Sequence, residues 1–112
     1  MKKIEAIIRP SRLEALKDEL HEAKISGLTI SQVLGCGQQM GWTEQYRSNK
    51  VLINILPKIE IKLIVDDDNV DNIVDLIIKV ARTGEVGDGK IFISNVEDCI
   101  RIRTGERGKE AL

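Results

Sequence analysis

The sequence has little of what disulfide-linked, zinc-binding or membrane proteins need. Its 112 residues include two cysteines, Cys36 and Cys99, and one histidine, His21. The cysteines form no C-x-x-C pair and no ligand cluster surrounds the histidine, so we expect two reduced, partly buried thiols and no zinc site. No apolar run approaches the roughly 18 residues of a transmembrane helix, and the first residues lack a signal-peptide core. We therefore expect a cytoplasmic protein.

An excess of one charge is also lacking. The 17 basic and 18 acidic residues give a formal net charge of -1, so no general attraction to nucleic acid or to an anionic membrane is expected. The composition, 42% hydrophobic and 31% charged, is that of an ordinary soluble chain. The length predicts a single domain, residues 1–112, with one hydrophobic core.

The spacing of apolar residues predicts two β-α-β units. Strands are expected at about 4–8, 28–34, 59–65 and from 91, and helices at about 13–23 and 70–81. This order (βαββαβ) is the ferredoxin-like arrangement of the α+β class, a duplicated split β-α-β unit with an antiparallel sheet and both helices on one face. Ile7, Ile64 and Phe92 are candidates for the other face, which predicts symmetric self-association without setting the number of subunits.

Local signals predict where the helices begin and end. Ser11, with Glu14 three residues later, is typical of a capping box. The run Asp66–Asn69 offers capping oxygens and negative charge at the start of the second helix. Gly27 and Gly84 are expected to end the two helices.

Residues 37–56 follow neither a helical nor a strand period. The stretch Gln38–Lys50 is polar and contains the single tryptophan, Trp42. A loop of this length in a small domain is usually functional or disordered. No Ser-His-Asp set or carboxylate pair can be identified, and His21 is expected on the surface of the first helix, so the residues do not predict an enzyme.

The segment Gly84–Lys90 combines three glycines with a lysine, which favours phosphate binding by backbone N–H groups and an ammonium. It nearly matches a Walker A motif, but Ile91 replaces the Mg²⁺-binding hydroxyl and the segment runs from helix to strand, the reverse of a P-loop. The alternative is a turn that simply needs glycine. Gly35 and Gly37, after the second strand, likewise permit close approach of a ligand or merely mark the strand exit.

A second candidate for phosphate binding lies near the end of the chain. Arg101 and Arg103 are two residues apart, so on an extended chain their side chains would point the same way. Two guanidiniums together suit a polyphosphate. The alternative is a solvated basic tail that pairs with Glu106 and Glu110.

Taken together, these segments make the whole chain resemble the PII signal-transduction proteins. The matching stretches are Arg82-Thr83-Gly84, Gly87-Asp88-Gly89-Lys90-Ile91-Phe92, Arg101 to Gly108, Thr43-Glu44, Tyr46-Arg47 and Leu56-Pro57-Lys58. The resemblance implies a ferredoxin-like homotrimer with nucleotide clefts between subunits. It also implies an effector loop (the T-loop) at about 37–55, a glycine-rich loop at about 82–90 and a C-terminal loop at about 101–108.

The resemblance implies small-molecule ligands. ATP and ADP would compete for one cleft, and 2-oxoglutarate would join ATP and Mg²⁺ there. The nucleotide-binding positions are Thr29, Gly35, Gly37, Gln38, Gln39, Ile64, Gly87, Asp88, Gly89, Lys90, Arg101 and Arg103. The 2-oxoglutarate positions are Gln39, Gly41 and Lys58, and Gln39 would also ligate the Mg²⁺.

Protein partners are implied as well. They are an ammonium channel, and glutamine synthetase or a nitrogen transcription regulator, with no direct contact to nucleic acid. The contact positions are Trp42, Tyr46 and Arg47, of which Arg47 would enter the channel exit and recruit the protein to the membrane surface. The resemblance thus implies nitrogen and energy signalling rather than catalysis, with slow ATP hydrolysis left open.

Five positions depart from the pattern that is common in the family. Gln38, Met40 and Lys62 stand where arginine, lysine and glutamate are frequent, which leaves the preference for ATP or ADP open. Val51 and Asn49 replace a tyrosine and a serine that are modified in some members. We therefore expect signalling without covalent modification of the loop, although other hydroxyls remain in it.

Two other classes are compatible with the same fold. One is a small nucleotide-hydrolysing enzyme subunit, which would need a general base that the residues do not supply. The other is a purely structural trimer, similar to the divalent-cation-tolerance proteins. A structural trimer would not need Gly87–Lys90 together with Arg101 and Arg103, so ligand binding separates these classes.

Overall fold

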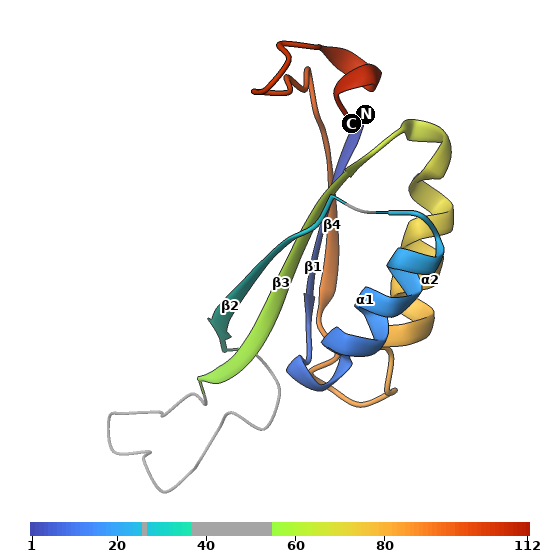
Figure 1. The fold of residues 1–112 in the computed structure, drawn as a ribbon. Coiled ribbons are helices and arrows are strands. Elements are labelled where there is room, and N and C mark those ends of the chain that lie inside the picture. The colour runs from blue at the N-terminus through green and yellow to red at the C-terminus, as the bar shows by residue number, and fades with distance from the viewer. Residues whose placement is uncertain (26, 37–54) are drawn as a thin grey trace, which may run out of the picture.

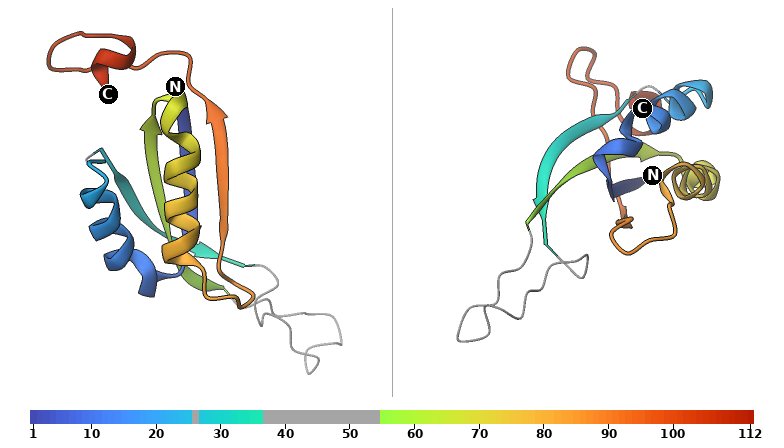
Figure 2. Two further views of the ribbon diagram at one scale, coloured as in Figure 1. Left: turned by 90° about the vertical axis from the view of Figure 1, so that its right-hand side faces the viewer. Right: turned by 90° about the horizontal axis from the view of Figure 1, so that it is seen from below.

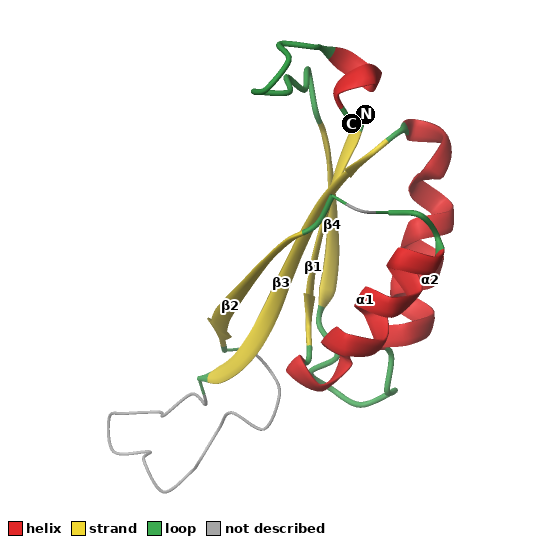
Figure 3. Cartoon of the chain, in the orientation of Figure 1, coloured by secondary structure: helices red, strands yellow, loops and turns green. Residues whose placement is uncertain are grey.

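The computed structural model describes residues 1–25, 27–36 and 55–112. Its strands are β1 (Lys2–Ile8), β2 (Thr29–Gly35), β3 (Leu56–Val65) and β4 (Lys90–Asn95), and its helices are α1 (Leu13–Glu22) and α2 (Val70–Ala81). Short 3-10 turns are described at Pro10–Arg12, Asp67–Asn69 and Gly108–Ala111. The predicted order of strands and helices is confirmed (Figure 1 and Figure 3).

The four strands form one antiparallel sheet in the order β2-β3-β1-β4. Both helices cover the same face of this sheet, as the two further views show (Figure 2). The ferredoxin-like prediction is therefore correct. β3 begins at Leu56 rather than Ile59 and includes Pro57, which the sheet tolerates because β3 pairs there with β2 alone.

The core lies between the sheet and the two helices. Alternate residues of the central strands β1 and β3 point into it, which is the period-2 pattern of a sheet with one buried face. The helices add residues at helical spacing. The buried set is Ile4, Ala6, Ile8, Leu16, Leu20, Ile59, Ile61, Leu63, Val65, Ile73, Ile77 and Ala81.

The opposite face of the sheet carries charged and apolar side chains together. Glu5 of β1 pairs with Lys62 on one side and with Phe92 on the other. Phe92 is 55% exposed, while Ile7 and Ile64 are partly exposed on the same face. Self-association is predicted for this face, because the exposed Phe92 and the partly exposed Ile7 and Ile64 favour burial.

The helix starts differ from the capping signals in the sequence. Ser11 lies inside the 3-10 turn Pro10–Arg12, and neither this turn nor α1 has a side-chain cap. The capping-box prediction is wrong because an N-cap residue needs extended backbone, which Ser11 lacks. Glu14 instead lies 3.2 Å from Lys17 in an exposed ion pair.

Lys24, not Gly27, ends the first helix. Lys24 has a φ of 64°, and its N–H donates to the carbonyl of His21 at 2.9 Å. The N–H of Ile25 donates to the carbonyl of Leu20, also at 2.9 Å. These two bonds are those of a Schellman motif, with Lys24 at the position that glycine most often occupies.

The second helix ends without a left-handed cap. Arg82 follows α2 in extended backbone, and its N–H donates to the carbonyl of Ile78 at 3.0 Å. Gly84 does have a positive φ, 93°, but its N–H donates to Asp88. Gly84 therefore belongs to the following loop rather than to the helix end, and the predicted helix stop is wrong.

The acidic run before α2 makes ion pairs instead of caps. Asp66 lies 2.8 Å from the ammonium of Lys109, and Asp67 lies 2.9 Å from the amino group of Met1. No side-chain cap is present at the start of either the 3-10 turn Asp67–Asn69 or α2. The Asp66 contact brings the C-terminal segment onto the start of α2.

Two smaller expectations concern the thiols and the histidine. Cys36 is exposed rather than partly buried, because it lies just past the end of β2, whereas Cys99 is partly buried as expected. His21 is exposed on α1. In the part of the chain that the structure describes, no helix is long and apolar enough to cross a membrane.

Candidate ligand-binding site

The glycine-rich loop between α2 and β4 is folded around the carboxylate of Asp88. The backbone N–H groups of Thr83 and Gly84 each donate to this carboxylate at 2.8 Å, and the Thr83 hydroxyl donates to it at 2.5 Å. Arg9 follows the last residue of β1, and its Nε donates to the Asp88 carboxylate at 3.0 Å. Its Nη2 donates to the carbonyl of Val86 at 2.8 Å. The side chain of Asp88 thus fixes the loop and ties it to β1.

These contacts act on the acidity of Asp88. The hydrogen bond from the Thr83 hydroxyl, followed by those from the Thr83 and Gly84 N–H groups and from Arg9, holds the pKa of Asp88 far below its ordinary value. Partial burial acts in the opposite direction and is outweighed. Asp88 is therefore a permanent anion within the loop at physiological pH.

Two glycines of the loop have left-handed backbone. Gly87 has a φ of 104° and Gly89 a φ of 101°. A Cβ at Gly89 would lie 1.6 Å from the carbonyl oxygen of Ile7, so the loop could not pack on β1 with any other residue there. The turn interpretation thus holds for Gly89, whatever ligand the loop also binds.

Lys58, near the start of β3, reaches the same loop. Its Nζ donates to the carbonyl oxygen of Gly87 at 2.7 Å. Burial, followed by the positive charge of Arg9, lowers the pKa of Lys58, while Asp88 partly offsets this effect. A Cβ at Gly35 would come within 3.2 Å of Cγ of Lys58, so the end of β2, the start of β3 and the loop meet at this point.

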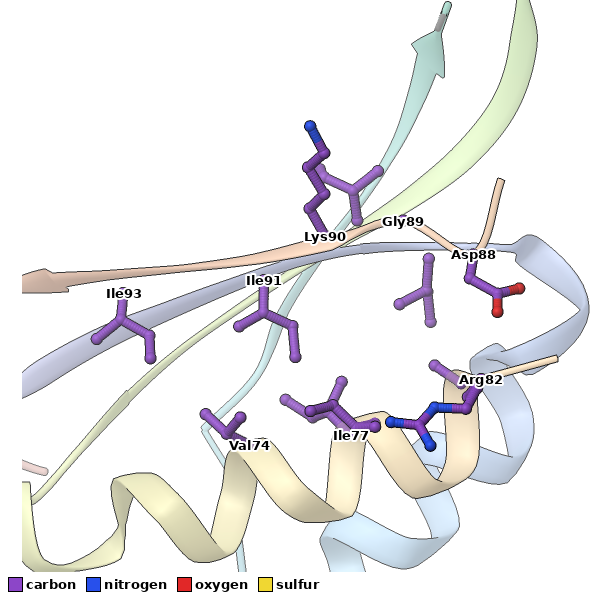
Figure 4. Close-up of a pocket in the computed structure, with 12 residues that line it drawn as sticks. Val74, Ile77, Arg82, Asp88, Gly89, Lys90, Ile91 and Ile93 are labelled. Atoms are coloured by element: carbon purple, nitrogen blue, oxygen red, sulfur yellow. The ribbon is translucent and has the colours of Figure 1, made fainter. Parts of the chain in front are cut away.

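Two hollows flank this meeting point. One, of about 390 Å³, lies over β2 and the start of β3; it is lined by Pro10, Gln32, Val33, Leu34, Pro57, Lys58 and Ile59. The other, of about 380 Å³, lies between α2 and the sheet, with Asp88, Gly89 and Lys90 in its lining. Figure 4 shows Ile91 and Ile93 pointing from β4 towards α2 in the second hollow, while Lys90 points away from it.

The segment after β4 does not have the extended backbone from which a paired arginine clamp was predicted. Residues 102–104 form a turn, and the N–H of Gly105 donates to the carbonyl of Arg101 at 2.7 Å. The guanidinium of Arg101 bonds to the Glu106 carboxylate at 2.9 Å and to the carbonyl of Glu110 at 3.3 Å. The pairing of Arg101 with Glu106 that the alternative interpretation expects is thus present, and phosphate binding by Arg101 stays a prediction. Arg103 is exposed in the turn.

Within one chain the predicted site residues fall into two groups at opposite ends of the sheet. The loop group consists of Gly35, Lys58, Gly87, Asp88, Gly89 and Lys90. The far group consists of Arg101 and Arg103, with Thr29 and Ile64 in the parts of β2 and β3 farther from the loop. β4 runs between the two ends, and its six residues span about 20 Å. Figure 1 shows the two ends clearly.

Several predicted residues lie outside the described part of the chain. They are Gly37, Gln38, Gln39, Gly41, Trp42, Tyr46 and Arg47. The Mg²⁺ position predicted through Gln39 and the partner contacts are among these.

Sequence reasoning missed the role of Arg9. It is 79 residues from Asp88 in the chain, and no local pattern could connect the two. Thr83 belongs to a segment that matches the PII pattern, but its bonds to Asp88 form only in the folded loop. The hydrogen bonds to Asp88 could therefore be identified only from the structure.

The comparisons with known proteins decide the family. A family profile described as nitrogen regulatory protein P-II matches residues 1–106. The chain belongs to the nitrogen regulatory protein P-II family. Relatives named nitrogen regulatory protein P-II from Nostoc punctiforme and Synechocystis are 54% and 51% identical over 112 residues, covering 100% of both chains. One named P-II 2 from Methanothermobacter thermautotrophicus is 51% identical over all of this chain and 97% of its own.

A solved P-II structure has the same fold. The structure titled "Crystal Structure of Arabidopsis thaliana PII bound to citrate" is similar with a TM-score of 0.81 and 38% sequence identity. The match covers 99% of this chain and 91% of that one. The P-II relatives are named as regulatory proteins, which agrees with the expectation of a regulator rather than an enzyme.

Proposed function

We propose that this P-II family member senses nitrogen and energy status by binding ATP or ADP together with 2-oxoglutarate. The main support is the glycine-rich loop, which Asp88 holds in one conformation and which Lys58 contacts through Gly87 at 2.7 Å. A loop that is already ordered loses little entropy when it binds a ligand, which favours affinity. A purely structural trimer would not require such a loop.

The loop end would bind the phosphates. Gly87 and Gly89 have left-handed backbone, and Lys90 is exposed at the start of β4 with its ammonium turned away from α2. An ammonium and backbone N–H groups together suit a di- or triphosphate. Asp88 would act by shaping the loop, because its carboxylate already accepts hydrogen bonds from four donor groups.

We further propose that each cleft forms between two chains of a homotrimer. The loop group and the far group lie at opposite ends of one sheet, too far apart for one nucleotide to contact both groups of the same chain. A neighbouring chain packed on the open face would bring its Arg101 and Arg103 to the loop of the first. The exposed Phe92 on that face favours such packing.

Lys58 would bind 2-oxoglutarate. Its ammonium is already directed at the glycine-rich loop, where a carboxylate beside bound ATP would be an electrostatically better partner than a backbone carbonyl. Mg²⁺ would be held by ATP and Gln39, and Gly41 would complete the site. The citrate named in the Arabidopsis structure title supports a carboxylate ligand for the family.

The T-loop would then report the bound ligand to partners. These would be an ammonium channel, reached through Arg47 with Trp42 and Tyr46, and glutamine synthetase or a nitrogen transcription regulator. Recruitment from the cytoplasm to the membrane surface would follow from the channel contact. ADP would favour one conformation of the loop, and ATP together with 2-oxoglutarate would favour another. A ligand shifts the equilibrium between two conformations only as far as its affinities for them differ.

Isothermal titration calorimetry tests the proposal. Purified protein should bind ADP and ATP, and should bind 2-oxoglutarate only when ATP and Mg²⁺ are present. Absence of heat and of thermal stabilisation with both nucleotides would refute it. An assay of phosphate release in the same samples would show whether ATP is hydrolysed, and rapid turnover would support the enzyme alternative.

A further inference from the structure

The guanidinium of Arg101 is held by three acceptors of the C-terminal segment. Nη1 donates to Oε1 of Glu106 at 2.9 Å, and Nη2 donates to the backbone oxygens of Glu110 at 3.3 Å and Leu112 at 3.2 Å. Three of the five N–H groups of a guanidinium are thereby engaged. Two remain for an incoming oxygen, so these contacts orient Arg101 without saturating it.

Glu106 is itself fixed, and it supplies the one side-chain acceptor among these three. Its Oε1 also accepts from the Thr104 hydroxyl at 2.8 Å, and its own N–H donates to that hydroxyl at 3.2 Å. Its carbonyl accepts from the N–H of Arg101 at 2.9 Å. The carboxylate therefore bridges Arg101 and Thr104 across a closed turn.

The turn is anchored to the rest of the domain. The N–H of Gly108 donates to the carbonyl of Cys99 at 2.9 Å and to the carboxylate of Asp98 at 3.2 Å. Lys109 lies 2.8 Å from Asp66 at the start of α2. Arg101 is therefore oriented relative to the sheet and α2, not merely within a loose tail.

We propose that Glu106 is a positioning residue for the nucleotide site, which holds the guanidinium of Arg101 ready for the phosphates. This inference rests on the proposed function, in which Arg101 binds phosphate.

Two effects of Glu106 on phosphate binding compete, because its carboxylate positions Arg101 and its negative charge repels phosphate. The Glu106 carboxylate is 41% exposed, so solvent and salt screen the repulsion. Fixing a long side chain before binding removes an entropic cost that screening does not reduce.

Two substitutions separate positioning from repulsion. Glu106→Ala removes both the charge and the acceptor, whereas Glu106→Gln keeps an amide oxygen for Arg101 and Thr104 and removes only the charge. We expect the Kd for ADP to rise about tenfold in Glu106→Ala, a typical coupling within one hydrogen-bond network. We expect a change below about threefold in Glu106→Gln. Glu110→Ala is the matched control, because Glu110 contacts Arg101 through its backbone carbonyl.

A double-mutant cycle tests whether Glu106 acts through Arg101. Calorimetry with ADP on wild type, Arg101→Ala, Glu106→Ala and the double variant should show no further weakening by Glu106→Ala once Arg101 is absent. Additive losses would overturn the inference, and so would tighter ADP binding by both Glu106 variants, which would identify Glu106 as a competitor of phosphate. If Glu106→Ala does not fold, Thr104→Val replaces it, with weakening again expected only when Arg101 is present. Failure of wild type to bind either nucleotide would refute the proposed function instead.

Discussion

The ammonium of Lys58 donates a hydrogen bond of 2.7 Å to the carbonyl oxygen of Gly87. A residue near the start of β3 is thus joined to the middle of the glycine-rich loop. The bond couples the proposed effector position to the proposed phosphate position, because an ammonium has three donors and Lys58 could contact the loop and a bound carboxylate together.

Lys58→Ala should separate the two ligands. It removes the ammonium for a carboxylate, and we expect 2-oxoglutarate binding in the presence of ATP and Mg²⁺ to weaken by at least about 30-fold. ADP affinity should change by less than about threefold, because water can solvate the Gly87 carbonyl. Lys17→Ala is the matched control, because Lys17 is a lysine of α1 whose ammonium pairs with Glu14 at 3.2 Å and which has no part in the proposed site. Equal loss of both ligands in calorimetry would show that Lys58 is misassigned.

Asp88→Asn should loosen the glycine-rich loop in a pH-dependent way. Because the folded pKa of Asp88 lies below its ordinary value of 3.8, its ionised form stabilises the fold above about pH 4, and this contribution is lost as the pH falls through the folded pKa. We expect a lower Tm for Asp88→Asn at pH 7, by a few degrees, and weaker ADP binding. Urea unfolding of both proteins from pH 7 to pH 2 should show their stabilities converging only below pH 4. A difference that stays constant over this range would assign it to shape rather than charge.

Gly89→Ala should be far more damaging than Gly84→Ala. Both glycines have positive φ values, 101° and 93°, which cost an alanine about 1–2 kcal/mol. A Cβ at Gly89 would also overlap the carbonyl of Ile7, whereas a Cβ at Gly84 meets nothing within 4 Å. We expect Gly89→Ala to destabilise by more than about 3 kcal/mol in guanidinium unfolding at one protein concentration. Similar losses for the two variants would mean that the loop moves away from β1 without cost.

The sequence predicts the fold well because its apolar spacing is regular. The alternation in β1 and β3 and the helical spacing in α2 leave little freedom over which face is buried. The helix ends are predicted poorly. For example, Lys24 adopts a left-handed backbone conformation at the end of the first helix, where the sequence pattern predicts a glycine. Contacts such as Arg9 with Asp88 link distant segments and follow only from strand register. The motif resemblance named the candidate residues and implied clefts between subunits, but which of these residues lie together in one chain follows only from the structure.

Mixed trimers should show whether each proposed cleft is shared between chains. Lys90→Ala damages the loop group and Arg101→Ala damages the far group, so a homotrimer of either variant should bind ADP weakly. In a mixed trimer with three clefts, one cleft combines an intact loop from the Arg101→Ala chain with an intact Arg101 from the Lys90→Ala chain. Random reassembly of equal amounts should restore about a quarter of all clefts to wild-type affinity, measured as the stoichiometry of tight ADP binding. If each site lay within one chain, no mixture would regain tight binding, because every chain would still carry one damaged group.

Mixing wild type with Lys90→Ala is the control for reassembly. The fraction of sites that bind ADP tightly should equal the wild-type fraction under either arrangement. A mixture of the two variants that binds no better than the separate homotrimers, with exchange verified by native mass spectrometry, would contradict the shared cleft.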